Sequence, residues 1–227
     1  MTTPSWNEER KLQKEGYTCV AGIDEAGRGP LAGPVIAAAV CFPAAKDSLA
    51  LLRTLKIRDS KQLSFEQREK LYAIFTSHPN IEWGIGKVGE RVIDALNIYH
   101  ATKLAMTKAV LHLNKKLQRK QSAVEFLLLD GTMLLDLSLP QKAIIRGDEK
   151  VMACAVASII AKVTRDRLMV RYHAKYPQYG FDKHKGYGTS LHMEMLEKYG
   201  PSPIHRKTFA PLNYMRVIDN TGRSRVY

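Results

Sequence analysis

Short runs of mostly apolar residues along the chain alternate with longer stretches of helical periodicity. The short runs are rich in Val, Ile, Leu and Ala, and Gly and Pro bound several of them. Runs of about four to eight residues of this kind are typical of buried strands. We therefore predict five strands, at residues 18–24, 35–42, 81–88, 125–129 and 142–145.

Four segments have the pattern of helices. Ser64 and Gln67 form a capping box, which predicts a helix from there to residue 77. Asn97 precedes a helical pattern that continues to residue 113, with alanines on one face. Two further helices are expected, a long one rich in alanine at residues 149–175 and a short one at 190–199.

The order of these elements indicates the fold class. Three strands come first and the later strands alternate with helices, so we expect an α/β fold with a mixed five-stranded sheet flanked by helices. The glycine-containing segment 179–189 is predicted to be a loop, and the basic tail 204–227 to be irregular. The simplest division is an arm at 1–16, a main domain at 17–178 and a C-terminal helical extension with a tail at 179–227.

The chain carries a strong excess of positive charge, with 35 Lys and Arg against 22 Asp and Glu and a formal net charge of +13. This excess favours a polyanionic partner, nucleic acid first, although many basic proteins bind nothing specific. The three cysteines lie among apolar or small residues and are expected to be buried and reduced. No apolar stretch is long enough to span a membrane and no signal-peptide pattern is present, so we expect a cytoplasmic protein without membrane partners.

Two adjacent carboxylates, Asp24 and Glu25, lie at the end of the first predicted strand, just before a glycine-rich turn. Buried neighbouring carboxylates repel each other, and a divalent cation between them would offset that cost. On a regular strand their side chains would point to opposite faces, so we expect the strand to end there and both to turn toward one site. Asp130 and Asp148 also follow predicted strands, whose carboxyl ends can meet at one edge of a sheet. Together the four acids predict an all-oxygen site for Mg²⁺ or Mn²⁺, with room for two ions.

Each of these acids also has a purely structural interpretation. Asp130 precedes Gly131, a pair that often marks a turn, and Asp148 precedes a helix, where it could be an N-cap. Asp166 lies four residues after Lys162, and a surface ion pair explains it. The histidines show no spacing that is typical of zinc ligands.

Several ordered motifs extend over nearly the whole chain, and a glycine-rich block near the N-terminus is the most specific of them. They are Asp24-Glu25-Ala26-Gly27-Arg28-Gly29-Pro30-Leu31-Ala32-Gly33-Pro34-Val35, Asp59-Ser60-Lys61-Gln62-Leu63, Asn97-Ile98, Leu129-Asp130-Gly131, Gly147-Asp148, Ala157-Ser158-Ile159-Ile160-Ala161-Lys162-Val163-Thr164-Arg165-Asp166 and His184-Lys185-Gly186-Tyr187-Gly188-Thr189. In this order they resemble the motifs of the ribonuclease HII family, the type 2 ribonucleases H. That family often has Lys-Ala-Asp or Lys-Gly-Asp where this chain has Arg146-Gly147-Asp148, and Arg in place of Lys preserves the charge.

The resemblance implies a ribonuclease H-like fold and hydrolysis with two divalent ions. It implies that the metal-binding acids are Asp24, Glu25, Asp130 and Asp148. It also implies that the ribose 2′-hydroxyl is read by Gly27, Arg28 and Gly29, that Tyr187 senses the ribonucleotide, and that Lys61 lies near substrate phosphate. These residue types suit the roles, because glycines let the backbone approach a sugar and the 2′-hydroxyl distinguishes RNA from DNA. Taken alone, the glycine stretch can also be explained as a tight turn, and Tyr187 as a loop aromatic covering the core.

We expect an endonuclease, acting as a monomer, that hydrolyses the RNA strand of RNA–DNA hybrids and incises duplex DNA at embedded ribonucleotides. It would leave 3′-hydroxyl and 5′-phosphate ends. Cations that could contact phosphate, or could simply be solvated, are Lys183, Lys185, Arg165, Arg167 and Arg171. Two other functions remain open. A structure-specific DNA nuclease would share the acids but not need a 2′-hydroxyl reader, and a non-catalytic nucleic-acid-binding module would not need the acids.

Overall fold

The computed structural model describes residues 3–43, 55, 57, 60–214, 216–218 and 224–226. Its centre is a five-stranded sheet in the order β3-β2-β1-β4-β5. The strands are β1 (Val20–Ala26), β2 (Val35–Cys41), β3 (Glu82–Val88), β4 (Phe126–Asp130) and β5 (Gln141–Ile144). β1 pairs antiparallel with β2, and β2 with β3, whereas β4 is parallel to both β1 and β5. The prediction of a mixed five-stranded sheet is confirmed.

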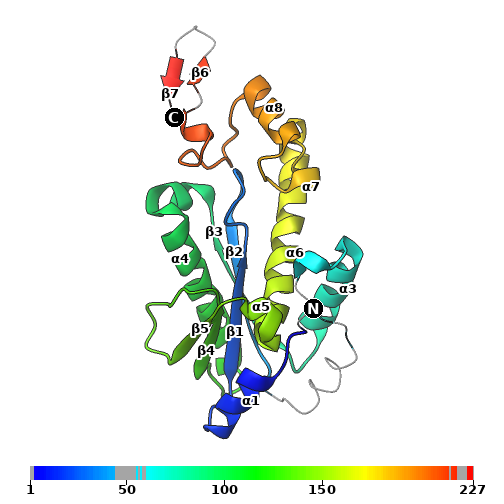
Figure 1. Ribbon diagram of the computed structural model, residues 1–227, viewed down its shortest axis with the longest axis vertical. Helices are drawn as coiled ribbons and strands as arrows, with labels where there is room; N and C mark the ends of the chain where they lie inside the picture. Colours follow the sequence, from blue (N-terminus) through cyan, green and yellow to red (C-terminus); the bar gives the residue numbers. More distant parts are fainter. Residues whose placement is uncertain are drawn as a thin grey trace.

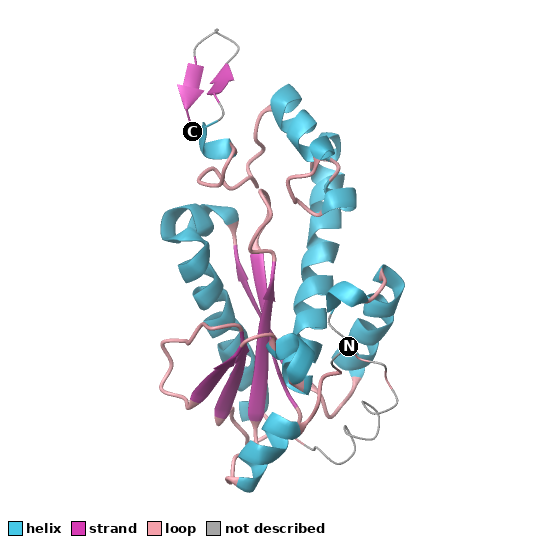
Figure 2. Cartoon of the chain, viewed as in Figure 1, coloured by secondary structure: helices cyan, strands magenta, loops and turns pink. Residues whose placement is uncertain are grey.

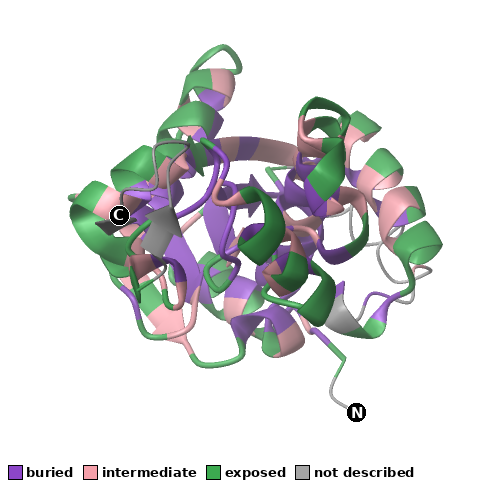
Figure 3. Cartoon of the chain, turned by 90° about the horizontal axis from the view of Figure 1, so that it is seen from above, coloured by how far each residue is buried: buried purple, intermediate pink, exposed green. Residues whose placement is uncertain are grey.

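Two long helices cover the two faces of the sheet (Figure 1). α6 (Met152–Lys175) packs on one face and α4 (Glu90–Gln118) on the other, and β2 is buried along its whole length. Small residues allow this close packing, since a Cβ added to Gly86 would lie 1.8 Å from the Ala105 carbonyl oxygen. Figure 3 shows buried residues between the helices and exposed residues on their outer surfaces. Burial on both faces explains why the strands appear in the sequence as continuous apolar runs.

The N-terminal arm lies at the start of α6. It contains the helix α1 (Asn7–Lys14), whose Glu9 side chain is buried. Glu9 Oε1 accepts a hydrogen bond from the N–H of Ala153, in the first turn of α6. The arm therefore caps the helix that covers one face of the sheet.

The expected helix at 149–175 is interrupted near its start. Val151 is extended (φ −116°, ψ 125°) and forms a parallel bridge with Ser5. The residues before it form a separate short helix, α5 (Gly147–Lys150), and α6 begins directly after it. The prediction of one continuous helix is therefore wrong, because pairing with the N-terminal arm holds this residue in an extended conformation.

α4 extends beyond both ends of the predicted helix at 97–113, and Asn97 marks a kink inside it. Asn97 has a left-handed φ of 65°, and its side-chain oxygen accepts hydrogen bonds from the N–H groups of Tyr99 (2.9 Å) and His100 (3.2 Å). Asn97 thus caps the second part of α4, which is the part that the sequence predicted.

The capping box predicted before the next helix is confirmed. α3 (Phe65–Ser77) follows a short 3-10 helix, η1 (Ser60–Gln62). The N–H of Gln67 donates to Ser64 Oγ (3.2 Å), and the N–H of Ser64 donates to Gln67 Oε1 (2.9 Å).

The C-terminal part is mainly helical, as expected (Figure 2). Its helices are η2 (Pro177–Tyr179), α7 (Phe181–His184), α8 (Ser190–Tyr199) and η3 (Leu212–Tyr214). The predicted loop at 179–189 is therefore wrong where α7 forms. The predicted irregular tail is wrong at β6 (Arg216–Ile218) and β7 (Ser224–Val226), which pair antiparallel at the end of the molecule far from α1 (Figure 1).

Two expectations drawn from composition can be compared with the structure. All three cysteines are buried and free of disulfides, as predicted. Within the described part of the chain, no helix has the length and apolarity that crossing a membrane requires.

Candidate active site

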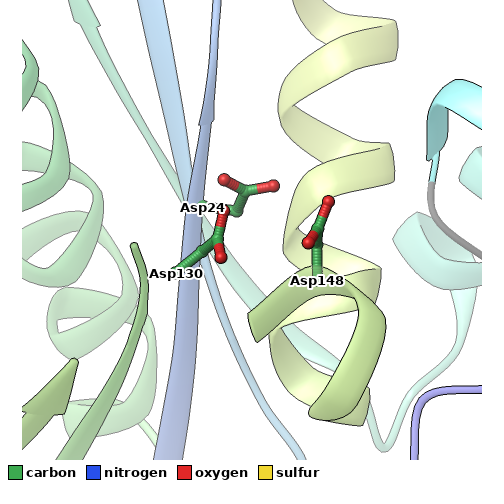
Figure 4. Close-up of side chains that lie close together, drawn as sticks. All are labelled: Asp24, Asp130 and Asp148. Carbon is green, nitrogen blue, oxygen red and sulfur yellow. The ribbon is translucent and has the colours of Figure 1, made fainter. Parts of the chain in front are cut away.

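Three aspartates from distant parts of the chain lie together at the carboxyl end of β4 (Figure 4). Asp24 lies near the end of β1, Asp130 is the last residue of β4, and Asp148 lies in α5. One carboxylate oxygen of each lies within 4.8 Å of the others. Asp24 and Asp148 are buried and Asp130 is half-buried. The parallel pairing of β1 with β4 brings the first two together.

Glu25 approaches this cluster from the other face of the sheet. The expectation that β1 ends at Asp24 is wrong, because β1 stays paired with β2 as far as Ala26. The two acids therefore alternate, and only Asp24 is on the face covered by α6. Glu25 nevertheless lines the same cavity as Asp24 and Asp130, and its Oε1 lies 3.2 Å from Arg28 Nη1. The four acids thus surround the end of β1 from both sides.

The environment of Asp24 and Glu25 opposes their ionisation. Burial raises the pKa of Asp24 well above its usual range, and repulsion from Glu25 and Asp130 adds to the effect. A hydrogen bond from Ser158 and one from the Glu25 N–H (2.7 Å) act in the opposite direction. Burial also raises the pKa of Glu25, although Arg28 opposes this shift. A bound cation would relieve such crowding of negative groups.

The turn before α5 sets the position of Asp130. Its Oδ1 accepts a hydrogen bond from the N–H of Gly147 at 2.6 Å. A Cβ added to Gly147 would lie 3.2 Å from the Asp130 Cα, so the absence of a side chain permits this approach. Arg146, in a left-handed conformation (φ 59°), pairs with Glu149 on the outer side. The turn thus brings β4 and α5 together and places Asp148 beside Asp130.

A cavity of about 330 Å³ opens beside the acids. It is lined by Asp24, Glu25, Ala26, Gly27, Arg28, Gly29, Ser60, Asp130, Ser158, Lys162, Arg165 and Tyr187. Asp24, Glu25 and Asp130 therefore share one cavity with the glycine-rich loop and with Tyr187, whereas Asp148 lies beside Asp24 and Asp130 without lining it. Lys61 lies in η1, and its side chain is outside the part that the structure describes.

Comparison with known proteins agrees with this arrangement. Residues 21–213 match the family model described as Ribonuclease HII. The chain belongs to the ribonuclease HII family. A ribonuclease HII from Dehalococcoides mccartyi is 50% identical over 214 residues, which cover 93% of this chain and 95% of that protein. One from Chlamydia trachomatis serovar A is 46% identical over 204 residues, which cover 90% of this chain and 88% of that protein.

A solved structure extends the likeness to the fold. The ribonuclease H2 of Pyrococcus horikoshii superimposes with a TM-score of 0.66 at 28% identity, covering 86% of this chain and 96% of that one. The fold is therefore the ribonuclease H-like fold expected from the motifs. As a member of the ribonuclease HII family, the chain is a metal-dependent endoribonuclease that acts on RNA–DNA hybrids.

In this ribonuclease HII chain, the glycine-rich loop and Tyr187 lie next to each other in the lining of the cavity. A Cβ added to Gly29 would lie 3.9 Å from Tyr187 Cε1, and the Tyr187 side chain is partly exposed. Gly27 has a φ of +94°, and a Cβ there would lie 2.0 Å from Arg165 Nε. Only glycine fits that position without moving Arg165.

Several residues of the site were not identified from the sequence. Ser158 and Ser60 both line the cavity and share a buried hydrogen bond of 2.9 Å. Lys162 also lines it while paired with Asp166 (2.9 Å). The sequence predicted this ion pair, but its expected surface position is wrong because Asp166 is buried. Ser60, Ser158 and Lys162 lie within the family motifs, which was the available signal.

Arg165 differs most from expectation. It is 1% exposed, so the interpretation as a solvated cation is wrong. Its guanidinium donates to the carbonyl oxygens of Ala32 (3.1 Å), Pro34 (3.1 Å) and Lys185 (3.0 Å). Arg165 therefore ties the glycine-rich loop to the segment that carries Tyr187.

Proposed function

We propose that the chain cuts the RNA strand of RNA–DNA hybrids with two divalent ions, leaving 3′-hydroxyl and 5′-phosphate ends. We further propose that it incises duplex DNA at single embedded ribonucleotides. One observation supports both parts. The carboxylates of Asp24, Asp130 and Asp148 come together beside a cavity that Gly27, Gly29 and Tyr187 also line or border, so groups for hydrolysis and for sugar recognition are adjacent.

The acids fit divalent metal ions. Among the described side chains, neither Asp24 nor Asp130 forms an ion pair with a lysine or arginine, although Asp24 is buried and Asp130 half-buried. Carboxylate oxygens are the ligands that Mg²⁺ and Mn²⁺ prefer. We propose Asp24, Glu25, Asp130 and Asp148 as ligands. When bound, two such ions supply an activated water and stabilise charge on the leaving oxygen.

The residues of this chain hold the substrate and the acids. Ser158 orients Asp24 through the hydrogen bond noted above. Backbone groups of Gly27 and Gly29 can hydrogen-bond a 2′-hydroxyl, and the Tyr187 ring can pack against the sugar. We assign Arg28 to the support of this loop or to phosphate, and Lys61 to phosphate, the latter on the family resemblance alone.

The rest of the molecule is consistent with a polyanionic substrate. The net charge of +13 favours association with nucleic acid and predicts weaker binding at higher salt. We propose that the segment after residue 178 contacts substrate through Tyr187. We also propose that the enzyme acts as a monomer in the cytoplasm.

Three matched duplexes test the proposal: RNA–DNA, DNA–DNA, and DNA with one ribonucleotide, each with Mg²⁺ or Mn²⁺. We expect cleavage of the first and third only. Comparable cleavage of all-DNA duplex would indicate a DNA nuclease, and no cleavage at all would indicate a binding module. Tyr187→Ala should weaken the preference for the ribonucleotide more than duplex binding, and an equal loss on every substrate would contradict its role.

Substitution of the acids tests the metal site. Asp24→Asn and Asp130→Asn should each abolish cleavage and weaken Mn²⁺ binding in titration calorimetry while the fold is retained, because each removes a ligand charge. Asp136→Asn is the matched control, since Asp136 is exposed and pairs with Lys103 away from the cavity. Full activity in both site variants would refute the assignment.

A further inference from the structure

The segment 202–206 contacts the glycine-rich loop directly and is connected to Tyr187 through His192. Arg206 is fully buried and donates to the carbonyl oxygens of Gly27 (2.5 Å), Arg28 (2.7 Å) and Gly33 (2.9 Å). Its backbone N–H also donates to the Leu31 carbonyl (2.8 Å). One side chain therefore fixes the carbonyl groups of the glycine-rich loop.

This contact determines where the amides of the loop point. A trans peptide is planar, so its N–H points opposite to its C=O. When the Gly27 and Arg28 carbonyls point toward Arg206, the N–H groups of Arg28 and Gly29 point away from it. Neither of these two amides donates to a protein acceptor within the described residues. They are thus held ready for a ligand at the cavity wall that Arg28 and Gly29 form.

The neighbouring His205 supports the other recognition element through His192. His205 Nε2 lies 2.9 Å from His192 Nε2, and His192 Nδ1 lies 2.9 Å from the Tyr187 carbonyl oxygen. A carbonyl only accepts, so His192 carries its proton on Nδ1 and accepts at Nε2. His205 must then donate from Nε2, and its Nδ1 accepts from the Ser202 N–H (2.8 Å). The tautomers of both rings follow from this chain of hydrogen bonds.

Both histidines are buried, and this chain of hydrogen bonds requires both imidazole rings to be neutral. Burial lowers the pKa of His192 to about 4 and that of His205 to about 3. The two rings therefore keep one hydrogen-bonding pattern at neutral pH. The Tyr187 backbone is held in place by a donor that does not change its protonation state there.

Apolar packing does not explain why these buried residues are arginines. Neither Arg165 nor Arg206 forms an ion pair among the described side chains, and burial and the proximity of Arg165 lower the pKa of Arg206 to about 9. Burying an unpaired cation costs several kcal/mol, so apolar residues would serve packing better. An apolar side chain has no hydrogen-bond donors, whereas the planar guanidinium of Arg206 has N–H groups that orient three carbonyl groups of the loop.

We propose that Arg206 and the His192–His205 pair are positioning residues that set the preference for ribose over deoxyribose. The proposal rests on the proposed role of the glycine-rich loop and Tyr187 as readers of the 2′-hydroxyl. Arg206 orients the loop amides, and the histidine pair fixes the backbone of Tyr187 beside the loop. Both act through neighbours, from the segment 202–206 and from His192 in α8.

Binding without cleavage tests the proposal. Fluorescence anisotropy in Ca²⁺ gives the Kd for a DNA duplex with one ribonucleotide and for the all-DNA duplex. Arg206→Lys keeps the positive charge but loses the planar set of guanidinium N–H donors. We expect it to reduce the ratio of the two affinities about tenfold, equivalent to one net hydrogen bond, and to leave the all-DNA Kd within about twofold.

A pair of substitutions at the histidine separates its hydrogen bond from its volume. In His205→Gln the Nε2 donor remains, and the preference should be retained. In His205→Leu the donor is lost, and the preference should fall about tenfold, as for Arg206→Lys. Leu117→Ala, a buried residue of α4 that does not line the cavity, controls for lost stability and should leave the ratio unchanged.

The outcomes distinguish this proposal from the proposed function. If the wild-type protein binds both duplexes equally, the proposed recognition of the 2′-hydroxyl is refuted, and the positioning role proposed here is refuted with it. If the wild-type protein prefers the ribonucleotide and Arg206→Lys and His205→Leu keep that preference, only the positioning role is refuted. Equal loss in His205→Gln and His205→Leu would also refute the role of the hydrogen-bonded pair.

Discussion

The N-terminal arm contains a buried acid whose replacement should stabilise the protein in a pH-dependent way. Glu9 is 3% exposed, and its Oε1 caps α6 through the Ala153 N–H at 2.9 Å. Its Oε2 has no hydrogen-bond partner among the described residues. Burial is the main cause that raises the pKa of Glu9 from 4.5 to about 7. In the folded protein the side chain therefore binds a proton more tightly than in the unfolded chain.

The sign and size of the effect follow from linkage. Between pH 4.5 and about 7 the unfolded chain loses this proton first, so the free energy of unfolding falls as the pH rises. A shift of this size corresponds to about 3 kcal/mol above pH 7, where the penalty is complete. Glu9→Gln keeps the Oε1 acceptor and has no charge. Its unfolding free energy, relative to wild type, should thus grow by about 3 kcal/mol from low to high pH.

Urea unfolding of both proteins at several values between pH 4.5 and 8 measures this difference, with EDTA present so that metal binding does not contribute. Other groups titrate in the same range, but they are common to both proteins and cancel in the comparison. A difference that stays constant across this range would refute the reasoning, because it would show that Glu9 titrates alike in the folded and unfolded states.

Three further predictions concern the site and the core. Gly27→Ala places a Cβ on a residue with a φ of +94°, 2.0 Å from Arg165 Nε. The single-turnover cleavage rate should therefore fall about 100-fold while the Mn²⁺ affinity is retained, and an unchanged rate would contradict this prediction. Gly86→Ala meets the Ala105 carbonyl oxygen and should lower the unfolding free energy by more than about 2 kcal/mol in urea, and a neutral result would contradict the packing. Because the pKa of His205 is lowered to about 3, the free energy of unfolding should fall as the pH drops below 6.5. It should fall less in His205→Gln, and parallel pH profiles of the two proteins would contradict this prediction.

The strands and the fold class could be predicted because local pattern and burial agree. β2 is covered on both faces, so its sequence is a continuous apolar run. The capping box of Ser64 and Gln67 is a local signal that needs no tertiary contact. The break at Val151 could not be predicted, since it depends on pairing with Ser5, far away in the sequence. The kink at Asn97 was visible only as the start of a helix.

The candidate site was recognised through its motifs, whereas its support was not. Asp24, Glu25 and Asp130 lie at the ends of apolar strands, which makes them conspicuous in the sequence. An arginine suggests a surface position, yet Arg165 and Arg206 are buried, and their hydrogen-bond partners are backbone carbonyl groups, most of them in segments distant in sequence. No sequence pattern shows which carbonyl oxygens will lack partners until the chain has folded.

The parallel pairing of β1 with β4 has a consequence for the newly made protein. Asp24 leaves the ribosome long before its neighbour strand is synthesised, and Asp148 comes later still. Contacts between such distant segments form slowly, because a long loop must close first. A nascent or truncated chain that ends before α5 thus lacks Asp148, so the proposed metal site stays incomplete until α5 has been synthesised.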